Sequence, residues 1–252
     1  MAMPTRPDVA AQVRRPLDAL NFFLADVRDG LGPYLAIYLL TVQRWDDDAV
    51  QLAWHDAVLG RDATFRHITV NLGGGLVRLA PTVTYAGPGG SAELLGVSFA
   101  GDGEHFESRL YVDHSMPNCK SRVLYKNALL GESARTVWIG DVRIRPSATG
   151  TDTYEMNRNL LLSDGARADS VPNLEIETGD IAGAGHASAT GRFDDLQLFY
   201  LQSRGITEEE ARRLVVRGFL FEIVQQIGSP ALQEHPQTAI EAELTVSVPA
   251  AN

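Results

Sequence analysis

The sequence predicts a mainly β fold followed by a helical tail. From Ala63 to Phe193, runs of β-branched and aromatic residues such as FRHITVNL and RTVWIGDVRIRP alternate with Gly, Asn, Asp and Pro. Most runs last roughly five to ten residues, and none keeps a helical period. This spacing is typical of a β-sandwich, a β-barrel or a β-solenoid. Because no exact repeat is visible, spacing alone does not separate the three.

Helices are predicted after residue 193. Asp194 or Asp195 can cap a helix over LQLFYLQSR, which ends at Gly205. The segment TEEE, beginning at Thr207, matches a capping box and starts a second helix. This second helix has a continuous apolar stripe, formed by Ala211, Leu214, Val215, Phe219, Ile223 and Ile227. A Gly-Ser-Pro break then precedes a short third helix over residues 231–244.

The N-terminal segment LDALNFFLADVRDGLGPYLAIYLL, residues 17–40, is apolar enough to suggest a membrane span. It is interrupted by four charged residues, Asp18, Asp26, Arg28 and Asp29. Each charge costs about 2.5–3.5 kcal/mol at the centre of a bilayer, and the same charges break the apolar region that a signal peptide needs. We therefore expect a short helix that packs on the protein, without stable membrane insertion.

Composition excludes several functions. A net charge of −10, with a pI near 5.0, argues against binding to nucleic acid or anionic membranes, which requires clustered Lys and Arg. The single cysteine, Cys119, excludes an internal disulfide and fits a reducing cytoplasm. No phosphate-binding G-x-x-x-x-G-K-[ST] motif is present, so we expect no direct ATP binding.

Two positions are candidate metal ligands. His186 lies in GAGHASATGR, where small neighbours leave an imidazole accessible. A neutral imidazole can bind iron, although an isolated His is more often a hydrogen-bonded structural residue. Cys119 follows His114 by five residues, which could bring both near one metal. A closed site needs four ligands, and a buried structural thiol is the commoner role of a free Cys.

A carbohydrate-active enzyme is the main enzymatic alternative. Glu175 and Glu177 alternate on one strand of the sequence LEIET, and some parallel β-helix enzymes place catalytic carboxylates in this way. The sequence offers no clearer acid–base pair, and alternating acidic residues are also typical of a half-exposed strand.

Two long segments resemble a known family. YEMNRNLLLSDGARADSVPNLEIE, residues 154–177, and GHASATGRFDDLQLFYLQSRGITEEEARRLVVRGF, residues 185–219, resemble the C-terminal signature of the SufB/SufD family, and most closely its SufD branch. The resemblance extends over about residues 43–252. Residues 17–40 instead resemble the first transmembrane helix of a major facilitator transporter. We therefore expect a chimera with a foreign, helical segment (1–42), a β core (43–193) and a C-terminal helical segment (194–252).

The resemblance implies a fold and a role. The fold is a right-handed parallel β-helix with flanking helices. The role is that of a non-catalytic scaffold subunit in SUF iron–sulfur cluster assembly, which pairs with SufB through the β-helix and binds the SufC ATPase through the C-terminal helices. The cluster is transient and shared with SufB, with His186 as a possible ligand. Some relatives carry a Cys at the position of Ala184, which this chain lacks.

The resemblance leaves two further possibilities open. Some SUF complexes also bind reduced flavin, for which the sequence indicates no site. A solenoid homodimer without a role in cluster assembly is the third functional reading, beside the scaffold and the enzyme.

Overall fold

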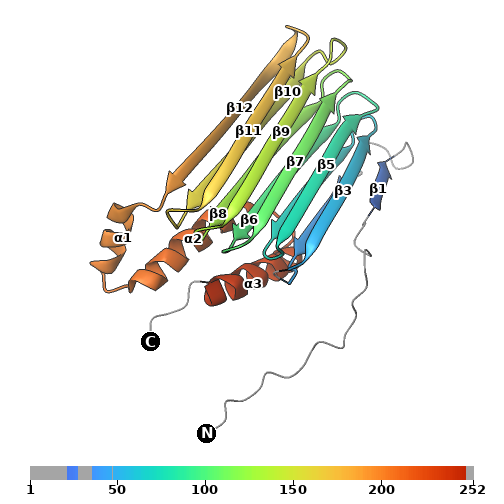
Figure 1. The fold of residues 1–252 in the computed structure, drawn as a ribbon. Coiled ribbons are helices and arrows are strands. Elements are labelled where there is room, and N and C mark those ends of the chain that lie inside the picture. Colours follow the sequence, from blue (N-terminus) through green and yellow to red (C-terminus); the bar gives the residue numbers. More distant parts are fainter. Residues whose placement is uncertain (1–21, 28–35, 47, 248–252) are drawn as a thin grey trace, which may run out of the picture.

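The computed structural model describes residues 22–27, 36–46 and 48–247, and it shows two parallel β-sheets with helices along one side (Figure 1). Sheet A has the strand order β1-β3-β5-β7-β9-β11, and sheet B has the order β12-β10-β8-β6-β4-β2. Sheet A is built from β1 (Phe22–Val27), β3 (Val50–Leu59), β5 (Leu76–Tyr85), β7 (His105–His114), β9 (Arg135–Ile144) and β11 (Arg167–Ile176). Sheet B is built from β2 (Ala36–Gln43), β4 (Thr64–Asn71), β6 (Ser91–Ala100), β8 (Lys120–Leu129), β10 (Thr151–Leu161) and β12 (Ile181–Arg192).

Consecutive strands alternate between the two sheets, so the chain winds as a solenoid. Ser91 of β6 lies beside Lys120 of β8, and Lys120 lies beside Asp152 of β10. One coil therefore takes roughly 30 residues, which is typical of a solenoid repeat. Parallel pairing is continuous from β1 to β11 and from β2 to β12. The predicted parallel β-helix is confirmed, and the sandwich and the barrel are excluded.

The outer faces of the two sheets have different environments. In sheet A, β5 and β9 alternate between buried and half-buried residues along their whole length, because solvent covers the outer face. In sheet B, β6 alternates only in its first half and is then buried throughout. The C-terminal helices pack on this second half and bury its outer residues, such as Leu95 and Val97, together with residues of the second helix such as Leu220.

The predicted helical tail is confirmed, including its caps. In α1 (Asp195–Gln202), the Asp194 side chain accepts a hydrogen bond from the Leu196 N–H, and Gly205 beyond the helix has φ +83°. In α2 (Glu208–Val224), the Thr207 side chain accepts from the Glu210 N–H. A third helix, α3 (Pro230–Ser247), is longer than the sequence predicts at both ends.

A buried lysine fixes α2 on sheet B. Lys126 of β8 is 1% exposed, and its Nζ donates to the Phe219 carbonyl at 3.1 Å and to the Glu222 carboxylate at 2.5 Å. The Phe219 ring lies 4.6 Å from the same ammonium group. A charge at this depth is tolerated only because these groups replace its water.

A ladder of polar side chains runs along the interior of sheet B. Equivalent register positions on β2, β4, β6, β8 and β10 carry Gln43, Asn71, Ser98, Asn127 and Asn159, all of them buried. Side chains on adjacent coils bond directly: Asn71 donates to Ser98 at 3.3 Å, and Asn127 donates to Asn159 at 2.8 Å. These hydrogen bonds between equivalent positions favour one register of the coils, although Gln43 Oε1 and Asn71 Oδ1 have no partner among the described residues.

The prediction of a short N-terminal helix is wrong for the described part of residues 17–40. Phe22–Val27 is strand β1, paired with β3, and Ala36–Gln43 is strand β2, paired with β4. The apolar run AIYLL at residues 36–40 has no two-residue period, so the sequence alone does not distinguish a strand from a buried helix there. The remaining residues of this segment lie outside the described ranges. Among the helices that the structure describes, none is long and apolar enough to cross a membrane.

Replacing Glu222 with Gln should lower the free energy of unfolding by about 1–3 kcal/mol, because Lys126 would stay buried without its counter-charge. Lys126→Met should be close to neutral, since it removes the buried charge and retains most of the volume. Urea unfolding measures both. Equal destabilisation by the two variants would show that volume, rather than the charge pair, fixes α2.

Candidate functional site

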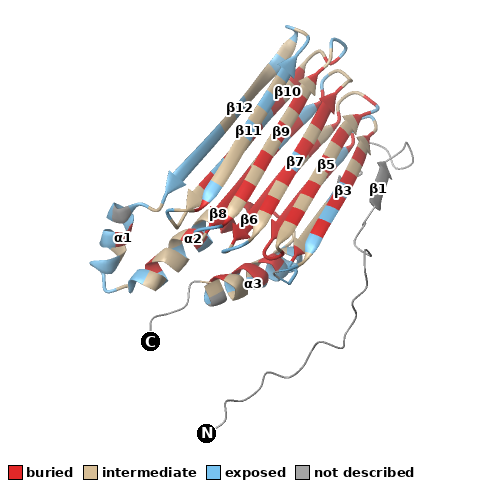
Figure 2. Ribbon diagram, in the orientation of Figure 1, coloured by how far each residue is buried: buried red, intermediate tan, exposed pale blue. Residues whose placement is uncertain are grey.

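The solenoid ends in two uncovered edge strands. Among the described residues, β11 is the last strand of sheet A and β12 the last of sheet B, and both are largely exposed (Figure 2). Apolar side chains on β11 are open to solvent, with Val171 43% and Ile176 46% exposed. Unpaired strand edges beside exposed apolar side chains are typical of an interface.

His186 lies at this open end. It stands on β12 directly beside Glu155 of β10, at an interior-facing register position, and its side chain is 44% exposed. The same position on earlier coils carries the buried residues His67, Leu94 and Val123. Since β12 has no further strand beyond it in the described chain, this position becomes accessible only here. The predicted accessibility of His186 is thus present in the structure.

A buried carboxyl lies beside His186 on the adjacent coil. Glu155 is fully buried, with its Oε1 3.9 Å from His186 Nδ1. Neither carboxyl oxygen has a hydrogen-bond partner among the described residues. Burial raises the pKa of Glu155 to about 8, and the nearby charge of Asp141 acts in the same direction. Gly140 on β9 leaves room for this carboxyl, because a Cβ there would lie 2.2 Å from Glu155 Oε2.

The sequence analysis missed Glu155 for a physical reason. Along β10 the buried positions are Thr151, Thr153, Glu155, Asn157 and Asn159, all polar. Tyr154 points outward and is 39% exposed. Inference from periodicity usually assigns the apolar residues to the interior, so for β10 it predicts that the wrong face is buried. The alternation of polar residues in TDTYEMNRN is the feature of the sequence that could have indicated a polar interior.

Cys119 and His114 occupy separate interior environments. The Cys119 thiol is fully buried and contacts the carbonyls of Gly87 and Pro117 at 3.6 Å, and burial raises its pKa. His114 Nε2 instead bonds to Ser121 Oγ at 2.9 Å. No group of three potential metal ligands occurs in the part of the chain that the structure describes. These contacts favour a structural role for Cys119, while its weak candidacy as a ligand stays a prediction.

The two candidate carboxylates, Glu175 on β11 and Glu177 directly after it, bind the same guanidinium group. Glu177 accepts from Arg143 Nη2 at 2.5 Å, and Glu175 lies 3.7 Å from Arg143 Nε. Both side chains therefore share one cation from the neighbouring strand β9. This arrangement supports an ion pair between strands rather than a glycosidase site.

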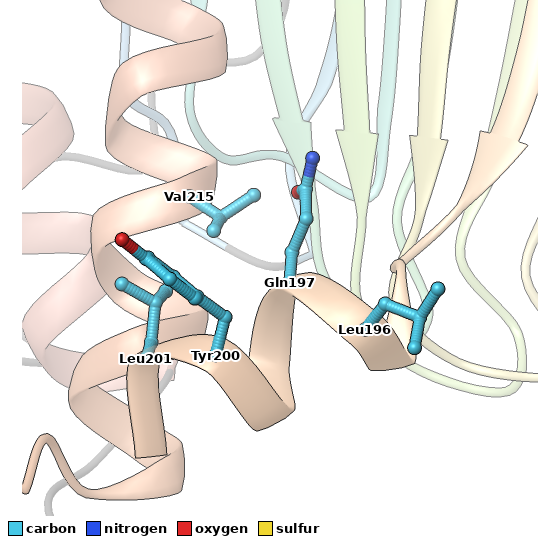
Figure 3. A pocket seen from close by; sticks show the side chains of 5 residues that line it. All are labelled: Leu196, Gln197, Tyr200, Leu201 and Val215. Atoms are coloured by element: carbon cyan, nitrogen blue, oxygen red, sulfur yellow. The ribbon is translucent and has the colours of Figure 1, made fainter. Parts of the chain in front are cut away.

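A second feature is an open apolar groove between α1 and α2. It is lined by Leu196, Gln197, Tyr200, Leu201 and Val215 (Figure 3). The apolar face of α1 around it is open to solvent: Leu196 is 78% and Phe199 69% exposed. Short helices in soluble proteins do not normally leave such residues uncovered, which marks this face as an interaction surface.

The fold and the open end define a class of protein: a parallel β-helix subunit with an uncovered terminal coil and a helical tail. A family model, the SufBD core domain of SUF system FeS cluster assembly, matches residues 36–219. The chain therefore belongs to the SufBD family of iron–sulfur cluster assembly proteins. The match begins at residue 36, so it includes β2 within the segment predicted to be foreign.

Curated relatives agree with this assignment. The chain is 63% identical, over 209 residues, to SufBD family iron–sulfur cluster assembly proteins of Mycobacterium leprae and Mycobacterium tuberculosis. That alignment covers 81% of this chain and 53% of each relative, so the chain spans about half the length of the curated relatives it matches. A second SufBD family protein of M. tuberculosis is 31% identical over 195 residues, covering 77% of this chain and 23% of the relative.

Stability should fall as the pH falls below 6.5, because His67 is buried in its neutral form. Burial and the neighbouring His55 lower the pKa of His67 to about 3. Between pH 6.5 and 3 the unfolded chain binds a proton there that the folded chain does not. The stability is fully present above pH 6.5, and about 2 kcal/mol is lost by pH 5. Urea unfolding from pH 7.5 to 5 should show a shallower dependence for His67→Gln.

Thr69→Val is the matched control, since it alters the same strand and the same interior without a titratable group. It should shift stability equally at every pH. If the free energy of unfolding of His67→Gln depends on pH as that of this control does, protonation of His67 is not the cause of the pH dependence.

Proposed function

We propose that this chain is a SufD-type, non-catalytic scaffold subunit, on which an iron–sulfur cluster is assembled together with SufB in the cytoplasm. The observation that carries the proposal is the position of His186. It is an exposed imidazole on the interior-facing side of the terminal coil, where an uncovered surface would meet a partner. The cluster is cargo that is built and passed on.

One imidazole is too few for a cluster. Iron–sulfur clusters are held mainly by thiolates, and the only Cys of this chain is buried away from the open end. Ala184, two residues before His186, contributes no ligand. SufB would therefore supply the thiolates and this chain one nitrogen, so that the cluster forms only when the two subunits meet.

Pairing with SufB is proposed at β11 and β12. Both edges present unpaired backbone groups, so a second solenoid can continue the sheets or cover the apolar side chains of β11. A second copy of this chain would meet the same surface, and a homodimer without a role in cluster assembly is the alternative outcome.

SufC is proposed to bind at the groove between α1 and α2. Exposed Leu196, Phe199 and Tyr200 give α1 an aromatic and aliphatic face of the kind that forms the centre of protein interfaces. ATP would bind to SufC, since this chain has no phosphate-binding motif. Binding of reduced flavin by the complex stays a prediction without assigned residues.

We also propose a division into a β-helix core ending at residue 193 and a helical segment from 194. Of the segment 1–42 that was expected to be foreign, only the part before residue 36, where the family match begins, keeps a chimeric origin as a hypothesis. The change from β12 to α1 at residues 193–194 supports the first boundary. Arg143 forms ion pairs with Glu175 and Glu177, which argues against a carbohydrate-active enzyme.

His186→Ala should lower the iron content of the complex at least tenfold without preventing its assembly. The chain is co-expressed with SufB and tagged SufC, purified without oxygen and measured for iron and for absorbance of the cluster. Ser188→Ala, two residues along the same face of β12, is the control and should retain iron. A His186→Ala complex as rich in iron as the wild type would contradict the proposed ligand.

The double variant Leu196→Asp, Phe199→Asp should weaken SufC binding roughly tenfold or more, because charges would replace the apolar centre of the interface. Both side chains are exposed, so folding should be unaffected. Leu232→Asp, at an exposed position on α3, is the control. Isothermal titration with SufC measures the affinities, and unchanged binding by the double variant would place the SufC site elsewhere.

A further inference from the structure

Among the residues that the structure describes, Glu155 is the one buried carboxyl whose presence the fold does not explain. Interior polar groups elsewhere on β10 are paired: Thr153 bonds to Ser121, and Asn157 and Asn159 bond to each other. The Glu155 oxygens have no hydrogen-bond partner among the described residues, although the side chain is fully buried. An unpaired buried polar group destabilises a fold, so such a group in a native structure calls for an explanation.

The Glu155 carboxyl lies between the opposite sheet and His186. On the opposite sheet Gly140 and the Trp138 ring bound the interior, and a Cβ at 140 would lie 2.2 Å from Glu155 Oε2 and 2.5 Å from the Trp138 ring. On the side of the open end, the cross-strand neighbour is His186. Its ring nitrogen Nδ1 lies 3.9 Å from Glu155 Oε1.

We propose that Glu155 is a positioning residue that accepts the Nδ1–H of His186 and thereby presents the Nε2 lone pair to iron at the open end. This inference rests on the proposed role of His186 as a ligand. The tautomer of a ligating histidine is set by the hydrogen bond of its other nitrogen, and carboxylate or carbonyl oxygens are the usual acceptors. Here the acceptor comes from the adjacent coil of the same chain.

The present separation fits an unassembled subunit. It exceeds the ~3.2 Å limit of a direct hydrogen bond, and His186 is 44% exposed, with no described residue covering it from outside. Hydrogen bonds at functional sites are often long before the complex forms and tighten within it. A subunit that covers β12 would press the imidazole toward Glu155, so the orientation would be completed by the same contact that delivers the other ligands.

Two substitutions separate positioning from a structural role. Glu155→Met removes both acceptor oxygens, keeps nearly the same length and places an apolar group in the interior. Glu155→Gln keeps one acceptor oxygen but removes the carboxylic acid. Positioning predicts that Glu155→Met shifts His186 toward the Nε2–H tautomer and lowers the iron content of the complex about 10–100-fold, the range found for lost outer-shell partners. It predicts that Glu155→Gln retains most of the wild-type behaviour.

The tautomer is measured first, in the isolated full chain and without metal. Long-range ¹H–¹⁵N correlation spectra report which imidazole nitrogen carries the proton, and the His186→Ala spectrum identifies the His186 signals. We expect Nδ1–H in the wild type and in Glu155→Gln, and Nε2–H in Glu155→Met. A wild-type protein with the proton on Nε2, or a Glu155→Met variant with an unchanged tautomer, would overturn the inference.

Iron content and unfolding then separate this inference from the proposed function. If wild type and Glu155→Met accumulate equal iron while His186→Ala does not, Glu155 has no positioning role and the scaffold proposal stands. If the wild-type complex accumulates no iron, the scaffold proposal fails, and the tautomer result alone decides on Glu155. A purely structural Glu155 predicts that Glu155→Met is less stable than the wild type in urea, whereas an unpaired carboxyl predicts equal or greater stability.

Discussion

In-register stacking of the coils is the constraint on which the rest of this structure depends. Each strand pairs only with the strands two before and two after it, so every side chain rests on the equivalent side chain of the next coil. A shift of one residue would turn the polar ladder of Asn71, Asn127 and Asn159 outward and bring outward residues into the interior. Each amide forms its best hydrogen bond with the amide at the equivalent position of the adjacent coil. The polar interior therefore specifies one register, whereas an entirely apolar interior would allow several.

The candidate site is a consequence of where this stack ends. On inner coils the position of His186 carries residues such as Leu94 and Val123, which are buried between neighbouring strands. On the last described strand the same interior-facing position lies at an uncovered edge, so the His186 side chain is accessible. Glu155, one coil deeper, remains in the dry interior, which is why its pKa is raised and its oxygens are unpaired. An accessible imidazole and a buried acceptor are therefore adjacent without any local distortion of the strands.

The sequence predicted the features that depend on local chemistry and missed those that depend on packing. Caps at Asp194 and Thr207 and the strand punctuation by turn residues are local, and the structure has them where they were expected. Residues 36–40 were assigned to a helix because their unbroken apolar run, AIYLL, shows no two-residue period. Glu155 was missed because β10 buries its polar side, and only the pairing with β12 shows that it lies beside His186.

The two proposed partner surfaces are joined rigidly and closely along the chain. β12 ends at Arg192 and α1 begins at Asp195, so only two residues connect the open edge to the exposed face of α1. Phe193 bonds through its N–H to the Leu161 carbonyl, and its ring lies 5.0 Å from the Arg212 guanidinium of α2. Since Lys126 fixes α2 to sheet B, this connection has little freedom. His186 lies six residues before Arg192, about 20 Å along the strand. The proposed action of an ATPase at α1 on a cluster at His186 requires such a short connection between the two surfaces.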